Sequence, residues 1–108
     1  MADCIFIYIT TSSRHEAEKI GHVLVEEQLV ACANIIPHVQ SIYRWQGAIE
    51  NAQEVVLIVK TVAGMFDAVA ERVKVLHSAT TPCIVALPIV DGTPDFLAWI
   101  KDNVLVFC

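Results

Sequence analysis

Charged residues are scarce in this chain, and no apolar run is long enough to span a membrane. Of its 108 residues, 18% are charged and 56% are hydrophobic, whereas soluble domains average roughly 45–50% apolar residues. The apolar residues come in blocks of about five to eight, which suits buried strands and falls short of the roughly 18 residues of a membrane span. We expect one folded domain covering residues 1–108, with no membrane segment.

Basic residues are few and form no cluster. The sequence has 7 lysines and arginines against 12 acidic residues, for a net charge of −5 at pH 7. Because a nucleic-acid-binding face needs a basic patch or stripe that follows the phosphates, we expect no nucleic-acid partner. An acidic surface is compatible with binding cations.

Motifs of catalysis, phosphate binding and structural zinc sites are absent as well. The 4 glycines are isolated, so no glycine-rich phosphate loop forms, and neither GxSxG nor HExxH occurs. The 4 cysteines include no CxxC pair and no finger-like spacing. The first residues lack the basic start of a signal peptide, so we expect reduced thiols and a cytoplasmic location. These absences indicate a protein that is not an enzyme.

The sequence does contain a regular succession of strand and helix signals. Strands rich in β-branched and aromatic residues are predicted at residues 4–10, 30–44, 49–61, 83–89 and 104–108. Helices with one apolar face are predicted from Ser13 to about Gln28, from Gly64 to the loop at 77–82, and from Asp95 to Asn103. Residues 45–48 are predicted to form the turn of a long hairpin.

Three local signals set the expected boundaries. Ser13 and Glu16 form a capping-box pattern, in which the serine accepts from the amide three residues on and the glutamate reaches back. Thr93 is expected to cap the last helix, with Pro94 at its first position. Pro37 lacks an amide donor, so it is expected at a bulge or a sheet edge.

The order of elements is that of two split βαβ units in tandem. The two halves are similar, since residues 7–11 (IYITT) resemble residues 57–61 (LIVKT). We therefore expect an α+β fold: a ferredoxin-like βαββαβ antiparallel sheet with both helices on one face, plus an extra short C-terminal helix and strand.

Both faces of the predicted sheet are apolar. Ile5, Ile7 and Ile9 point to one side of the first strand, and Phe6 and Tyr8 point to the other. Two helices can cover only one face, whereas an antiparallel sheet with one wet face would alternate apolar and polar residues. The long hairpin also outruns the other strands and is unstable alone. We expect copies of the chain to cover the second face in a closed cyclic oligomer, whose number of subunits composition alone does not fix.

A set of motifs extends over nearly the whole chain. It comprises ACANIIP at 31–37, SIYRWQG at 41–47, Glu54, Lys60-Thr61, His77, Pro82, Leu87-Pro88-Ile89 and Leu97-Ala98-Trp99. In kind and order these motifs resemble the CutA family of divalent-cation tolerance proteins. The resemblance implies a compact homotrimer with a ferredoxin-like fold, similar in architecture to PII-type signalling proteins. It also implies a role in tolerance of divalent cations, especially copper, and no established catalytic reaction.

One segment departs from the family pattern. The family usually has His-Pro-Tyr-Glu-x-Pro-Glu after the second helix, whereas residues 77–83 here read HSATTPC. His77 and Pro82 are kept, but the tyrosine and both acids are lost, and Cys83 replaces the last acid. Losing hard oxygen ligands and gaining a soft thiol would weaken a manganese-like or magnesium-like site and favour copper(I) or zinc. The alternative is that this segment is not used for metal here.

Cys32, His77 and Cys83 are the candidate metal ligands, because thiolate and imidazole suit copper or zinc. The alternative for the two cysteines is packing as small apolar strand residues. The alternative for His77 is that it ends a helix, where the helix dipole favours it. Three further histidines are expected on the solvated surface: His15, His22 and His38.

A second candidate set consists of Tyr43, Arg44, Trp45 and Lys60. These side chains could line a pocket between subunits, where aromatic rings stack and a guanidinium group contacts anions. The alternative is that the first three are interface anchors. Lys60 is expected to pair with Glu54 or Glu50 across a boundary, or else to meet an anionic ligand in a cleft.

Three functions therefore stay open at this point. The first is a CutA-like trimer that binds copper or zinc and supports metal tolerance. The second is a PII-like signalling or scaffold trimer that binds a small anionic metabolite in clefts between subunits, using Arg44 and Lys60. The third is a structural trimer that serves as an assembly platform.

Overall fold

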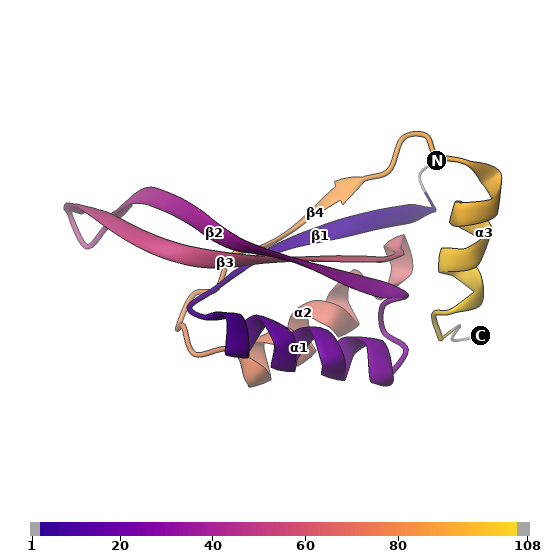
Figure 1. Cartoon of the computed structure of the whole chain (residues 1–108), viewed down its shortest axis with the longest axis horizontal. Helices are drawn as coiled ribbons and strands as arrows, with labels where there is room; N and C mark the ends of the chain where they lie inside the picture. Colours follow the sequence, from indigo (N-terminus) through magenta and orange to yellow (C-terminus); the bar gives the residue numbers. More distant parts are fainter. Residues whose placement is uncertain (1–2, 106–108) are drawn as a thin grey trace.

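One antiparallel sheet carries two helices on one face, and a hairpin projects from one end of it (Figure 1). The computed structural model describes residues 3–105. Its elements in chain order are β1 (Cys4–Thr11), α1 (Arg14–Glu26), β2 (Cys32–Trp45), β3 (Ala48–Val62), η1 (Ala63–Met65), α2 (Phe66–Leu76), β4 (Ile84–Pro88) and α3 (Pro94–Asp102). The strands lie in the order β2-β3-β1-β4, and each neighbouring pair is antiparallel. This order confirms the ferredoxin-like α+β fold.

The start of α1 forms as the capping pattern predicts, with one difference. The Ser13 hydroxyl accepts a hydrogen bond from the Glu16 amide at 3.1 Å. The Glu16 carboxylate reaches back one residue further than predicted and accepts from the Ser12 amide at 2.9 Å. The helix ends at Glu26 rather than near Gln28, because Gln28 adopts the left-handed conformation, with φ of 61°, that terminates helices.

Thr93 is the N-cap residue of α3, as predicted. Thr93 precedes the helix in an extended conformation, but its side chain makes no capping hydrogen bond. Pro94 begins the helix. Because proline has no amide hydrogen and its φ is already suited to a helix, this end has one fewer donor to satisfy than the start of α1.

The predicted final strand is wrong at Val104 and Leu105, which lie outside the sheet. The Leu105 amide instead donates to the Gln28 carbonyl oxygen at 2.8 Å, so this segment is fastened to the loop after α1. Residues 106–108 of that prediction lie outside the described residues.

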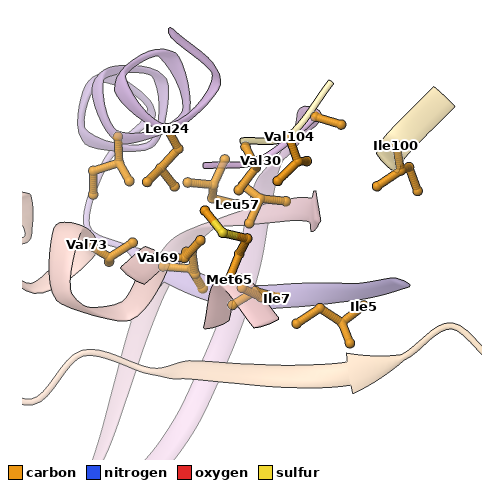
Figure 2. Close-up of a cluster of buried hydrophobic side chains, with 14 of the residues drawn as sticks. Ile5, Ile7, Leu24, Val30, Leu57, Met65, Val69, Val73, Ile100 and Val104 are labelled. Carbon is orange, nitrogen blue, oxygen red and sulfur yellow. The ribbon is translucent and has the colours of Figure 1, made fainter. Parts of the chain in front are cut away.

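The hydrophobic core lies between the sheet and the helices α1 and α2 (Figure 2). Ile7, Leu57, Leu24 and Val69 are fully buried there and come from β1, β3, α1 and α2. Ile100 of α3 is also fully buried and joins the same cluster at the end of the sheet. Alternate residues of β1 and β3 thus face the helices, as the sequence predicts.

The opposite face of the sheet is apolar too, as predicted. Cross-strand pairing places Phe6 beside Leu87 and Tyr8 between Val85 and Ile58, and directly opposed residues share a face. Val85 and Leu87 are 50% and 40% exposed, while α1 and α2 both lie on the other side of the sheet (Figure 1). We call this surface, made by Phe6, Tyr8, Ile58, Val85 and Leu87, the open face.

The two strands of the β2–β3 hairpin are the longest in the sheet. β2 has 14 residues and β3 has 15, against 8 in β1. Its turn is only Gln46 and Gly47, both with positive φ (50° and 82°), the combination that two-residue hairpin turns require. The projecting ribbon gives the molecule its elongated shape of 44 × 26 × 23 Å (Figure 1).

Candidate functional site

Four of the predicted site residues, namely Tyr43, Trp45, His77 and Cys83, line a pocket at the corner where β1 ends and the β2–β3 hairpin extends beyond it. The last pair of β1 is Thr11 with Val55, and β2 and β3 run on from there (Figure 1). The segment after α2 forms the remaining wall. The pocket has a volume of about 530 Å³ and is lined by Tyr8 and Thr10 of β1, Ser41, Tyr43 and Trp45 of β2, Glu54 of β3, and residues 77 and 79–83.

A β-bulge turns the aromatic side chains of the hairpin toward this pocket. β2 pairs regularly with β3 up to Ile36, opposite Val56, and resumes at Val39, opposite Glu54. The extra residue of β2 reverses its alternation, so that residues 39, 41, 43 and 45 share the face of Glu54. Pro37 lies within this bulge, as the sequence predicts. Unbroken alternation would have placed Arg44 on the pocket side instead.

Both ring nitrogens of His77 are engaged in hydrogen bonds. Nε2 lies 2.7 Å from the carbonyl oxygen of Thr10, and Nδ1 accepts from the Ala79 amide at 3.0 Å. Because an amide can only donate, Nδ1 is unprotonated and Nε2 carries the hydrogen that it donates to Thr10. The side chain is 4% exposed. His77 also caps the C-terminus of α2, so binding a metal would require one of its two bonds to break.

Glu16 connects the segment after α2 to the start of α1 by hydrogen bonds. Its Oε1 accepts from the amide and hydroxyl of Ser12 at 2.9 and 3.1 Å, and its Oε2 accepts from the Ser78 amide at 2.9 Å. Burial alone would raise the pKa of Glu16, but the hydrogen bonds from Ser12 and Ser78 outweigh it and lower the pKa. The ionised carboxylate therefore fixes the pocket wall.

The structure separates Cys32 from the other two candidate metal ligands. Cys83 is exposed and lines the pocket together with His77. Cys32 lies at the start of β2, opposite Lys60, whereas Thr10 lies opposite Val56. Four strand residues separate these two positions on β3, which corresponds to about 13 Å along the strand. Cys32 and His77 thus lie toward opposite ends of the sheet.

The candidate residues Arg44 and Lys60 are not brought together either. Arg44 lies on the face of the hairpin opposite to Tyr43 and Trp45. Within the chain, Lys60 Nζ donates to the Asn34 side-chain oxygen and forms no ion pair with a described acidic residue. Its pairing with Glu54 or Glu50 across a boundary stays a prediction. Only the aromatic members of this candidate set line the pocket.

The described part of the chain does not present a preformed metal centre. Within residues 3–105, no three His, Cys, Asp or Glu side chains gather closely enough to hold a metal ion. In the pocket, Cys83 is the one thiol of the lining and the His77 nitrogens are both occupied. The described side chains of a single chain therefore do not fit a copper or zinc ion without rearrangement or further ligands.

The sequence interpretation missed Tyr8, Glu54 as a pocket residue, and the role of Glu16. Counting alternation across a bulge at Pro37 could have placed Glu54 on the side of Tyr43. Nothing local signals that Glu16 bonds Ser78, because the two residues are 62 positions apart. His15, His22 and His38 are exposed, as expected.

No helix in the described part of the chain is both long and apolar enough to cross a membrane.

Comparisons with known proteins give the family. The chain is 48% identical over 97 residues to the divalent-cation tolerance protein CutA of Thermus thermophilus, covering 90% of this chain and 94% of that protein. It is 50% identical over 99 residues to the protein of the same name from Archaeoglobus fulgidus, covering 92% and 96%.

A solved structure agrees with these relatives. The structure of the periplasmic divalent cation tolerance protein CutA from Archaeoglobus fulgidus superposes with a TM-score of 0.91 at 47% identity, covering 94% of this chain and 99% of that one. The sequence profile of the CutA1 divalent ion tolerance proteins matches residues 5–103. The chain therefore belongs to the CutA1 divalent ion tolerance family.

Proposed function

We propose that this protein is a non-enzymatic homotrimer that supports divalent-cation tolerance by binding copper(I) or zinc with ligands from more than one subunit. The observation that carries the proposal is the open face: apolar side chains there are up to 50% exposed in one chain. A second copy would cover them, and a closed ring of three would do so for every subunit.

Two features support metal binding through shared ligands. Cys32 and Cys83 are free thiols, and they belong to the two ends of the strand order, at β2 and next to β4. Both edges of the sheet are available for contact with neighbouring subunits. Thiolates select copper(I) and zinc over harder cations. A site shared between subunits also accounts for the incomplete ligand set of a single chain.

A metal titration tests this function. Reduced protein would be titrated with copper(I) and with zinc, beside the variants Cys32→Ser, Cys83→Ser and His77→Ala, with Cys4→Ala as the control because Cys4 is buried at the far end of β1. Saturable binding that weakens in Cys32→Ser or Cys83→Ser but not in the control is expected. Binding that is absent, or unchanged in both variants, would contradict direct ligation.

The second candidate function is a PII-like trimer that binds a small anionic metabolite between subunits. Its supporting observation is that Arg44 and Lys60 form no ion pair with any described acidic residue. Since they lie on different faces of the hairpin, two subunits would have to combine them. Stabilisation by inorganic phosphate, lost in Arg44→Ala or Lys60→Ala, would favour this function over the first.

The proposed location is the cytoplasm. The described cysteines are unpaired, which suits a reducing compartment, whereas the similar Archaeoglobus fulgidus protein is described as periplasmic. Fractionation of producing cells distinguishes the two, and recovery in the periplasmic fraction would contradict the proposal.

A further inference from the structure

We propose that the pocket at the end of β1 binds a small organic cation, such as a quaternary ammonium group, between aromatic rings and the Glu54 carboxylate. This inference goes beyond metal tolerance. It depends on different side chains from the thiol ligands proposed above, so either proposal can fail without the other.

The lining has the chemistry of a cation site. Three aromatic rings, those of Tyr8, Tyr43 and Trp45, line the pocket together with one carboxylate, that of Glu54. The negative face of an aromatic ring attracts a cation within about 6 Å, and tryptophan does so most strongly. Rings that surround a quaternary ammonium group replace its water shell, while a carboxylate supplies the counter-charge.

The fold, rather than chance exposure, assembles these groups. Tyr8 faces the pocket side from β1, and Glu54 shares that face because it lies two residues before Val56, the partner of Thr10. The bulge at Pro37 then puts Tyr43 and Trp45 on the same side. In a single chain Tyr43 and Trp45 are 43% and 45% exposed, so each leaves a large part of its surface available to a ligand there.

The charges around the pocket are negative. Glu50 lies directly opposite Tyr43 and therefore on the same face as Glu54. The pocket lining contains no lysine or arginine. Arg44 faces the other side of the hairpin, and Lys60 is six residues from Glu54, or about 20 Å along β3. An anion entering here would meet carboxylates and no cationic side chain of the lining.

His77 does not supply a positive charge either. Its Nδ1 accepts from Ala79 and its Nε2 donates to Thr10, an arrangement that the neutral ring satisfies. Glu16, behind it, has its carboxylate oxygens bonded to Ser12 and Ser78. At about 530 Å³, the pocket falls within the roughly 300–1,000 Å³ range of small-molecule sites and has room for an alkylammonium group.

Trp45 provides the readout. The chain has 2 tryptophans, and Trp99 stacks on Phe96 in α3, at the other end of the sheet from the hairpin (Figure 1). In a Trp99→Phe background, the full-length protein in its natural assembly would be titrated with tetramethylammonium chloride. Sodium chloride at equal ionic strength, tert-butanol as the uncharged analogue, and inorganic phosphate serve as comparison probes.

We expect a saturable change in Trp45 fluorescence with tetramethylammonium only. Glu54→Gln should weaken binding at least about five-fold, by loss of the counter-charge at a cation–π site. Glu71→Gln, which removes the same charge from an exposed position on α2, should leave it within about two-fold. Circular dichroism verifies that each variant is folded.

Several results would overturn the proposal. No saturable response would show that the pocket is closed or filled in the assembled protein. An equal response to tert-butanol would show apolar binding without charge recognition, and binding of phosphate would show an anion site.

Discussion

The Nε2 atom of His77 lies 2.7 Å from the carbonyl oxygen of Thr10, which fastens the segment after α2 to the end of β1. On the other side of the ring, Nδ1 holds the Ala79 amide at 3.0 Å. One side chain thus joins two walls of the pocket. The sequence makes His77 a candidate metal ligand, whereas its two hydrogen bonds give it a structural role.

His77→Ala should lower the free energy of unfolding by about 2–3 kcal/mol, because it leaves the Thr10 carbonyl and the Ala79 amide without their partners. Urea denaturation of metal-free protein measures the loss. His22→Ala, at an exposed position of α1, is the matched control and should change stability by less than about 0.5 kcal/mol. Equal stability of both variants would contradict the structural role.

Glu16 makes the stability of this corner dependent on pH. The pKa of Glu16 is lowered in the folded protein. At pH values just below the ordinary pKa of 4.5, the unfolded chain therefore binds more protons than the folded protein. The stabilisation is complete above that ordinary value and is lost as pH falls through the lowered folded pKa. Acid therefore weakens the attachment of Ser78 to α1.

Glu16→Gln should reduce the slope of stability against pH between about pH 5 and pH 3, since the amide does not titrate. Part of the slope remains, because a hydrogen bond from Arg72 lowers the pKa of Glu27 in both proteins. Urea denaturation at several pH values measures the slopes, with Glu71→Gln as the control. Parallel curves for wild type and Glu16→Gln would refute the linkage.

Much of the fold could be predicted because its signals are local. β-branched alternation locates β1 and β3, and Ser13 and Pro37 act on their own neighbours, at a cap and at a bulge. The failure at residues 104–105 has a physical cause. Strand propensity indicates which residues can pair, whereas a strand forms only if the chain brings them beside the edge of a sheet.

Gln28→Gly should raise the free energy of unfolding by about 0.5–1 kcal/mol. Gln28 has φ of 61° after α1, where a side chain costs energy that glycine avoids, although glycine also loses more entropy on folding. Its carbonyl still accepts from Leu105. Gln53→Gly, at an exposed position of β3 without positive φ, should lower stability instead. The opposite order in urea denaturation would contradict this account.

The site was less predictable than the fold, because it depends on side chains that only the tertiary structure brings together. Tyr43 and Trp45 stand out in the sequence, but their partner Tyr8 is about 35 residues away and shares their face only because of the bulge. Arg44 is next to both in sequence and lies on the other side. Adjacency along a strand separates side chains rather than grouping them.

Val85→Lys should dissociate the proposed trimer. Val85 is 50% exposed on the open face of a single chain, so the substitution leaves the core intact, yet in a trimer that covers this face it buries an unpaired charge. Val75→Lys is the matched control, because Val75 is 73% exposed on α2, away from the open face. Light scattering after size exclusion should give a mass near three chains for wild type and Val75→Lys, and near one chain for Val85→Lys. A monomeric wild-type protein would contradict the proposal that a trimer covers the open face. A Val85→Lys variant that stays trimeric would show that the interface lies elsewhere.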